Sequence, residues 1–201
     1  MLGQINLGTE FGNILSNCAG RDDVKTIVEI GAWNGMGSTC CIADGILKAS
    51  KSCLFMSFEA NADMYNQAQT NLNNSKYKDV VKLLHGAIVG VDEFPTFESG
   101  AMVREWYDSD VRSCQSSTNY FDSLPDVIDF LFIDGGEYTG YIEYLKLKNR
   151  SNIIALDDTT CFKTKRVRAE LLLDATFGVL HDSQTDRNGC SVFVRKQFLK
   201  G

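Results

Sequence analysis

The chain has 201 residues, 44% of them hydrophobic, and a formal net charge of −6 at pH 7. A chain of this length and composition suits one globular domain with a full apolar core, and it argues against intrinsic disorder. The acidic balance excludes nucleic acid and anionic membrane surfaces as the expected partners, because both require a basic footprint on the protein.

The cysteines and the first residues bear on the compartment. Seven cysteines are scattered without a CxxC pair, and only two histidines accompany them, so no zinc-binding spacing is present. The segment MLGQINLGTEF lacks the basic and apolar regions of a signal peptide, and no apolar run approaches the ~20 residues of a membrane span. We therefore expect a reduced, cytoplasmic protein.

Apolar patterning predicts alternating strands and helices. Residues 5–18 show helical spacing and predict a leading helix. Short apolar runs predict seven strands, at 25–31, 52–59, 79–86, 127–134, 152–158, 176–182 and 190–196. Segments of helical character lie between some of these strands, at 37–49, 61–73 and 138–148. This alternation is typical of a parallel sheet covered by helices on both faces.

The connection between the last two strands, residues 183–189, is long enough for a hairpin and too short for a crossover. The last strand should therefore run antiparallel to its neighbour. We predict one α/β domain over residues 1–201, a Rossmann-like three-layer sandwich with a seven-stranded, mostly parallel sheet and an antiparallel last strand.

A polar, irregular stretch interrupts this alternation at residues 91–125, between the third and fourth predicted strands. The only two prolines of the chain, Pro95 and Pro125, lie at or near its two ends. The stretch is long enough for a helix and a lid over a binding site. We expect it to determine which acceptor molecule the protein selects, together with the leading helix.

Carboxylates recur where the predicted strands end. Glu29, Glu59, Asp134 and the pair Asp157–Asp158 all fall at or near the carboxyl end of a strand. Ligands of open parallel sheets bind outside these ends. Each residue alone has a structural alternative as a helix cap or turn former, including an N-cap role for Asp158. The joint pattern favours a binding site on this edge of the sheet.

The first strand leads into a glycine-rich turn, VEIGAWNGMGS, with glycines at positions 31, 35 and 37. A backbone of this kind can approach a ligand closely, or it can simply pack tightly. The spacing GxxxGxG differs from the GxGxxG of dinucleotide sites, which leaves a nicotinamide enzyme as a weak alternative. Glu29 would repel a pyrophosphate but would accept a cationic ligand.

The segment EIGAWNGMGS resembles motif I of class I S-adenosylmethionine-dependent methyltransferases. It is similar to the ExGxxxGxS form of small-molecule O-methyltransferases, which include macrolide and aminocoumarin sugar O-methyltransferases. SFEANADM, HGA, FIDGGEY and ALDDT follow in the order of that family, so the resemblance covers most of the chain. It implies methyl transfer to a hydroxyl of a small molecule, sugar or glycan.

The resemblance also implies the residues that bind S-adenosylmethionine. Glu59 would accept hydrogen bonds from both ribose hydroxyls, which suits a carboxylate because it is acceptor-only. The loop after the first strand would hold the methionine part, and Gly86 with Ala87 would flank the adenine. The implied set is Glu29, Gly31, Ala32, Trp33, Asn34, Gly35, Ser38, Glu59, Ala60, Gly86, Ala87 and Asp134.

In metal-dependent members of that family, a carboxylate after the fourth strand and a pair after the fifth hold a divalent ion. The matching positions here are Asp134, Asp157 and Asp158. Oxygen ligands without cysteine or histidine favour Mg²⁺. Asp134 is also the candidate catalytic proton acceptor. Gly136 and Thr159 depart from the pattern, so methyl transfer without a metal and a non-catalytic cofactor-binding or interaction protein remain alternatives.

Basic residues gather at 162–170, just beyond the aspartate pair, namely Lys163, Lys165, Arg166 and Arg168. They suit a solvated helix face or an anchor for an anionic substrate. The expected partner is a small-molecule or glycan acceptor, with no nucleic acid and no membrane. Assembly into a homo-oligomer is left open.

Overall fold

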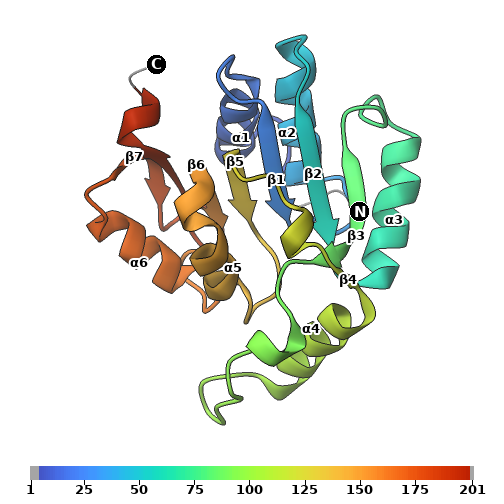
Figure 1. The fold of residues 1–201 in the computed structure, drawn as a ribbon, viewed down its shortest axis with the longest axis vertical. Coiled ribbons are helices and arrows are strands. Elements are labelled where there is room, and N and C mark those ends of the chain that lie inside the picture. Colours follow the sequence, from blue (N-terminus) through green and yellow to red (C-terminus); the bar gives the residue numbers. More distant parts are fainter. Residues whose placement is uncertain (1–4, 200–201) are drawn as a thin grey trace.

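The computed structural model describes residues 5–199, and an eight-stranded sheet forms its centre (Figure 1). The strand order is β4-β3-β2-β1-β5-β6-β8-β7. The strands are β1 (Thr26–Ile30), β2 (Leu54–Glu59), β3 (Lys82–Ala87), β4 (Thr118–Asn119), β5 (Ile128–Ile133), β6 (Ser151–Asp157), β7 (Phe177–Ser183) and β8 (Cys190–Arg195).

The directions of the strands confirm the predicted sheet. The strands from β4 to β6 pair in parallel, whereas β8 is antiparallel to both β6 and β7. The predicted number of seven strands is wrong by one. The additional strand β4 has two residues, which pair with Gly86 and Ala87, and so short a strand carries no apolar run that the sequence could reveal.

In the described part of the chain, the α-helices that accompany the sheet are α1 (Glu10–Gly20), α2 (Ser38–Lys48), α3 (Ala62–Asn73), α4 (Arg104–Ser116), α5 (Gly140–Leu147) and α6 (Lys165–Leu173). Short 3₁₀ turns lie at Val91–Glu93, Phe121–Ser123, Lys148–Arg150 and Lys196–Leu199. The leading helix begins later than predicted, because Thr9 caps it by accepting the Gly12 N–H at 3.1 Å.

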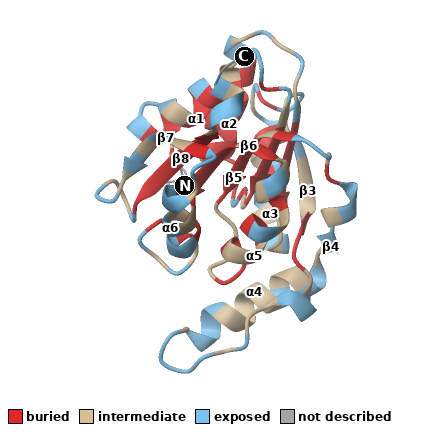
Figure 2. Ribbon diagram, turned by 60° about the vertical axis from the view of Figure 1, so that its left-hand side comes forward, coloured by how far each residue is buried: buried red, intermediate tan, exposed pale blue. Residues whose placement is uncertain are grey.

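Two apolar clusters lie on opposite faces of the sheet, which makes three layers. Alternate strand residues point to opposite faces, so Ile27 packs toward α1 and α2 while Val28 packs toward α5 and α6. Leu72 of α3 belongs to the first cluster. Figure 2 shows the buried residues concentrated in the sheet and on the helix faces against it.

Helix α4 is the exception to this packing. None of its residues is buried, and it lies beyond the carboxyl ends of the strands, below the sheet in the view of Figure 1. Hydrogen bonds hold it there: the Val103 N–H donates to the Tyr138 hydroxyl at 2.8 Å, and the Tyr138 N–H donates to Asp110 at 3.1 Å. The insert therefore contains the predicted helix, and its role as a lid stays a prediction.

Helices α1 and α2 pack so closely that a glycine is required between them. A Cβ atom added at Gly45 would lie 2.0 Å from the Ser16 carbonyl oxygen, and backbone cannot move aside as a side chain can. We expect Gly45→Ala to destabilise the protein by about 1–3 kcal/mol, the usual cost of overpacking. Urea denaturation measures this.

The matched control is Gly178→Ala in β7, where an added Cβ would make only ordinary contacts at 3.8 Å and beyond. Equal unfolding midpoints for the two variants would contradict the prediction.

Within residues 5–199, none of the helices combines the length and the apolar character needed to cross a membrane.

Candidate functional site

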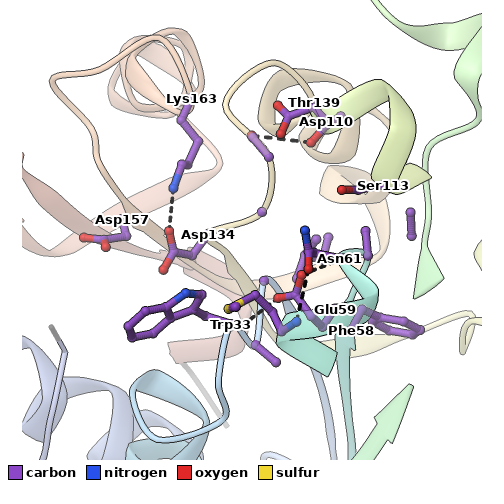
Figure 3. A pocket seen from close by; sticks show the side chains of 18 of the residues that line it. Trp33, Phe58, Glu59, Asn61, Asp110, Ser113, Asp134, Thr139, Asp157 and Lys163 are labelled. Carbon is purple, nitrogen blue, oxygen red and sulfur yellow. Dashed lines mark hydrogen bonds and ion pairs between the residues drawn. The ribbon is translucent and has the colours of Figure 1, made fainter. Parts of the chain in front are cut away.

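A cavity of about 440 Å³ opens at the carboxyl ends of β1, β2, β3, β5 and β6, with α4 on its far side (Figure 3). Its volume falls in the range of small-molecule and cofactor sites. Most of the predicted site residues line it: Gly31, Ala32, Trp33, Ser38, Glu59, Ala60, Gly86, Ala87, Asp134, Asp157 and Asp158. The structure therefore brings together residues that lie up to 127 positions apart in the sequence.

The glycine-rich loop after β1 lies against the backbone at Asp134, directly after the end of β5. Gly31 has φ +95°, and a Cβ there would lie 2.1 Å from the Asp134 carbonyl oxygen, so only glycine fits. The N–H groups of Gly31 and Ala32 both donate to Phe58, each at 2.9 Å. Trp33 follows in the left-handed region at φ 47°, with its side chain 41% exposed beside the cavity.

Three predicted cofactor residues do not line the cavity. Glu29 is fully buried beneath the glycine loop and accepts hydrogen bonds from Ser38, Thr39 and Ser57 at 2.6–2.7 Å. Burial raises the pKa of Glu29, and these three hydroxyls oppose that rise. Asn34 and Gly35 are not part of the cavity lining and lie against α3, where the Asn71 side chain donates to the Asn34 carbonyl at 2.9 Å. Glu29 thus supports the loop from below, and any direct contact with a ligand stays a prediction.

Glu59 at the end of β2 faces the cavity with its carboxylate. Its oxygens accept the N–H of Trp33 at 2.7 Å and the N–H of Asn61 at 2.9 Å, which fixes its orientation (Figure 3). Burial raises the pKa of Glu59 to about 7, although these backbone N–H groups oppose the rise. Each carboxylate oxygen has lone pairs beyond these bonds, so a ligand diol can still bind.

The three aspartates gather at the other end of the cavity. One carboxylate oxygen from each of Asp134, Asp157 and Asp158 lies within 4.8 Å of the other two. Two cations contact them. The Lys163 ammonium lies 2.8 Å from Asp134 and 2.8 Å from Asp158, and Arg187 lies 2.5 Å from Asp157.

Burial and these charges act in opposite directions on the aspartates. Burial raises the pKa of Asp134 to about 6 against the opposing effect of Lys163. Burial and the neighbouring Asp134 raise the pKa of Asp157 to about 7. The pKa of Asp158 is lowered, because Lys163 outweighs the effect of its burial.

Four charged residues of the cavity were not predicted as site residues. Asp110 of α4 and Glu143 of α5 add carboxylates, and Lys163 and Arg187 add the cations. Glu143 had a signal in the sequence, since it shares a helix face with Gly140 and Leu147, which are buried. The basic run 162–170 divides: Lys163 points inward, whereas Arg166 and Arg168 pair with Glu170 and Asp182 at the surface.

The parallel order β3-β2-β1-β5-β6, with the antiparallel β8 inserted between β6 and β7, makes an open α/β sheet, and ligands of such sheets bind beyond the carboxyl ends of the strands. No family model matches the sequence, and no curated protein sequence matches it. Solved structures do match.

An O-methyltransferase from Bacillus cereus, solved in complex with S-adenosylhomocysteine, matches with a TM-score of 0.64 and 16% identity, over 97% of this chain and 84% of that chain. The methyltransferase PaMTH1 from Podospora anserina, also bound to S-adenosylhomocysteine, matches with 0.61 and 17%, over 92% and 78%. The O-methyltransferase TomG from Streptomyces achromogenes, involved in tomaymycin synthesis, was solved with S-adenosylmethionine and matches with 0.59 and 12%, over 95% and 82%.

This chain therefore has the fold of S-adenosylmethionine-dependent O-methyltransferases, and the fold that the sequence motifs imply is confirmed.

Proposed function

We propose that this chain is an enzyme that transfers a methyl group from S-adenosylmethionine to a hydroxyl of a small molecule or sugar. The observation that carries the proposal is Glu59, a largely buried carboxylate directed into the cavity and held there by two backbone N–H groups. Burial raises its pKa because it disfavours the ionised form, and hydroxyl donors of a ligand would stabilise that form.

The residues that would hold the cofactor run along one side of the cavity. Glu59 would bind the two ribose hydroxyls, the loop at Gly31–Trp33 would hold the methionine part, and Gly86 with Ala87 would flank the adenine. The acidic cavity suits the cofactor, because six carboxylates and only two cations line it. The carboxylates are Glu59, Asp110, Asp134, Glu143, Asp157 and Asp158.

When bound, S-adenosylmethionine would supply an electrophilic methyl group, whose bond to sulfur would break as the acceptor oxygen bonds to the carbon and a neutral thioether leaves. Asp134 would receive the hydroxyl proton. Burial raises the pKa of Asp134, but the neighbouring Lys163 ammonium opposes this rise and favours the ionised carboxylate, which can accept a proton. The acceptor would enter between the aspartates and α4, whose Ser109, Asp110 and Ser113 face the same cavity.

The sequence also predicts a Mg²⁺ ion bound by the three aspartates. An all-carboxylate set within 4.8 Å suits a hard divalent ion, which supports Asp134, Asp157 and Asp158 as its ligands. The charges in the site do not fit, however, because Lys163 and Arg187 already contact all three aspartates. We therefore assign no step of the reaction to a metal.

Thermal unfolding with S-adenosylhomocysteine tests the proposal. A ligand at 100 times its dissociation constant stabilises by about 2.7 kcal/mol, which raises the Tm of a chain of this size by about 5–10 °C. NAD at the same concentration is the control and should leave the Tm unchanged. A shift with NAD and none with the nucleoside would overturn the assignment. Transfer of labelled methyl groups to a panel of hydroxylated acceptors separates an enzyme from a non-catalytic binder.

A further inference from the structure

We infer that Lys163 is a built-in cation that takes the place of a divalent metal ion in this site and binds the acceptor oxygen. The inference rests on the proposed methyl transfer and concerns how the acceptor hydroxyl is activated. It gives a functional role to Lys163, one residue of the basic run at 162–170. By sequence, this run suits a solvated helix face or an anchor for an anionic substrate.

The first observation is the position of the ammonium group. Lys163 Nζ lies 2.8 Å from Asp134 Oδ1 and 2.8 Å from Asp158 Oδ2, so it bridges two of the three carboxylates that a metal would need. Its side chain is only 12% exposed, although the lysine belongs to a loop before a surface helix. Figure 3 shows the side chain extending to Asp134.

The backbone on both sides of Lys163 is anchored, which makes this position a property of the fold. On one side, the buried Thr164 donates its hydroxyl to the Asp157 carbonyl at 2.5 Å. On the other, the Phe162 ring packs edge-on against Tyr138, with ring centres 5.2 Å apart. These contacts fix the loop between β6 and α6 so that Lys163 faces the cavity.

The second observation is the balance of charge. Arg187 Nη2 contacts the third aspartate, Asp157, at 2.5 Å. Two positive charges therefore already lie against the three negative charges of the aspartates. A divalent ion bound to Asp134 and Asp158 would stand beside an ammonium bonded to the same two carboxylates, and like charges in contact repel. Either the ion or the lysine can occupy the site.

The remaining N–H of the ammonium gives Lys163 a chemical role. An ammonium has three N–H donors, and two of them are used by Asp134 and Asp158. Within residues 5–199 no third hydrogen-bond or ion-pair partner holds the ammonium, so one donor is left for a ligand oxygen in the cavity. In the transfer, the acceptor hydroxyl would give its proton to Asp134, and its oxygen would bond to the methyl carbon as the carbon–sulfur bond breaks and the thioether leaves. Lys163 would keep its three protons and stabilise the charge that develops on the acceptor oxygen.

Binding of Mn²⁺ alone tests this, because Mn²⁺ favours carboxylate ligands and can be followed by its electron paramagnetic resonance. Wild-type protein and the control Lys165→Met, an exposed lysine two residues further on, should bind no Mn²⁺ at about 1 mM. Lys163→Met should gain a site about 100-fold tighter than any in the wild type, because one repelling charge is removed. Lys163→Gln gives the same test if the methionine variant folds poorly.

Tight Mn²⁺ binding by the wild type, or no gain in either Lys163 variant, would overturn the inference. S-adenosylhomocysteine binding to the wild type is measured in the same buffer and separates the two proposals. If the nucleoside fails to bind, the methyltransferase proposal itself fails. If the nucleoside binds and the wild type also binds Mn²⁺ tightly, only the role of Lys163 is wrong.

Discussion

Glu59→Gln is expected to weaken S-adenosylhomocysteine binding by about 100-fold, the result of losing hydrogen bonds to a charged acceptor worth about 3 kcal/mol in total. Glutamine keeps the shape of the side chain but loses the charge. The NH₂ group of its amide would also face the N–H of Trp33 or of Asn61, so that two donors would meet without an acceptor. Isothermal titration calorimetry measures the change, and Glu105→Gln, at an exposed glutamate of α4, is the control.

The same residue predicts how binding depends on pH in the wild type. Ribose hydroxyls donate to the ionised carboxylate, so binding lowers the pKa of Glu59 from its raised value of about 7 in the free protein. Affinity should be full above this pKa and should fall as the pH drops through it. We expect binding at pH 6 to be about tenfold weaker than at pH 8.

Asp134 and Asp157 also titrate in this range, so the variant is needed to assign the effect. Glu59→Gln should lose the part of the pH dependence that Glu59 causes, whereas Glu105→Gln should keep it. An affinity that is the same at pH 6 and pH 8 in the wild type would contradict the role of Glu59.

Glu143→Gln is expected to stabilise the protein at pH 8 by about 3 kcal/mol and to change its stability little at pH 5. Glu143 is 4% exposed, and its Oε2 atom has no hydrogen-bond partner among the described residues. Burial raises the pKa of this carboxyl from 4.5 to about 7. A rise of this size corresponds to about 3 kcal/mol of lost stability once the group is ionised.

The direction follows from linkage between ionisation and folding. The folded-state pKa of Glu143 lies above the unfolded value, so the protonated carboxyl stabilises the fold below about pH 4.5 relative to the ionised one. This stability is lost as the pH rises through 7. Glutamine resembles the protonated form at every pH and therefore avoids the loss.

Urea denaturation at pH 5 and pH 8 measures the difference between the two proteins. Other buried carboxyls titrate in both, so they cancel in the comparison. Glu105→Gln, which removes an exposed charge, should show no such pH-dependent gain. An equal effect of Glu143→Gln at both pH values would show that the carboxyl is not buried as an ionised group.

Local patterns determined the order of the elements and the acidic edge. Apolar runs such as Phe130–Ile133 form buried strands wherever helices cover both faces, and parallel strands place their carboxyl ends on one side. A carboxylate that directly follows such a run therefore reaches the same edge as the others. For this reason Glu59, Asp134 and Asp157 could be placed together from the sequence.

Glu29 shows the limit of this argument. It also lies near the end of a strand, one residue before the last residue of β1, but it shares a face with Ile27, and that face packs on α1 and α2. Its carboxylate meets the hydroxyls of Ser38 and Thr39 at the start of α2 instead of the cavity. The alternation of side chains along β1 held this information, because residues two positions apart point the same way.

The sequence by itself determined a Rossmann-like layered sheet and a row of carboxylates along one edge, because strand formation and strand ends depend on neighbouring residues. Only the tertiary structure decided which cations meet these carboxylates. Arg187 reaches Asp157 because β8 is inserted beside β6, with Cys190 opposite Asp157, so the hairpin turn before β8 lies over the end of β6. Lys163 reaches Asp134 because its loop is anchored at Thr164, and contacts between distant segments of this kind leave no periodic trace in the sequence.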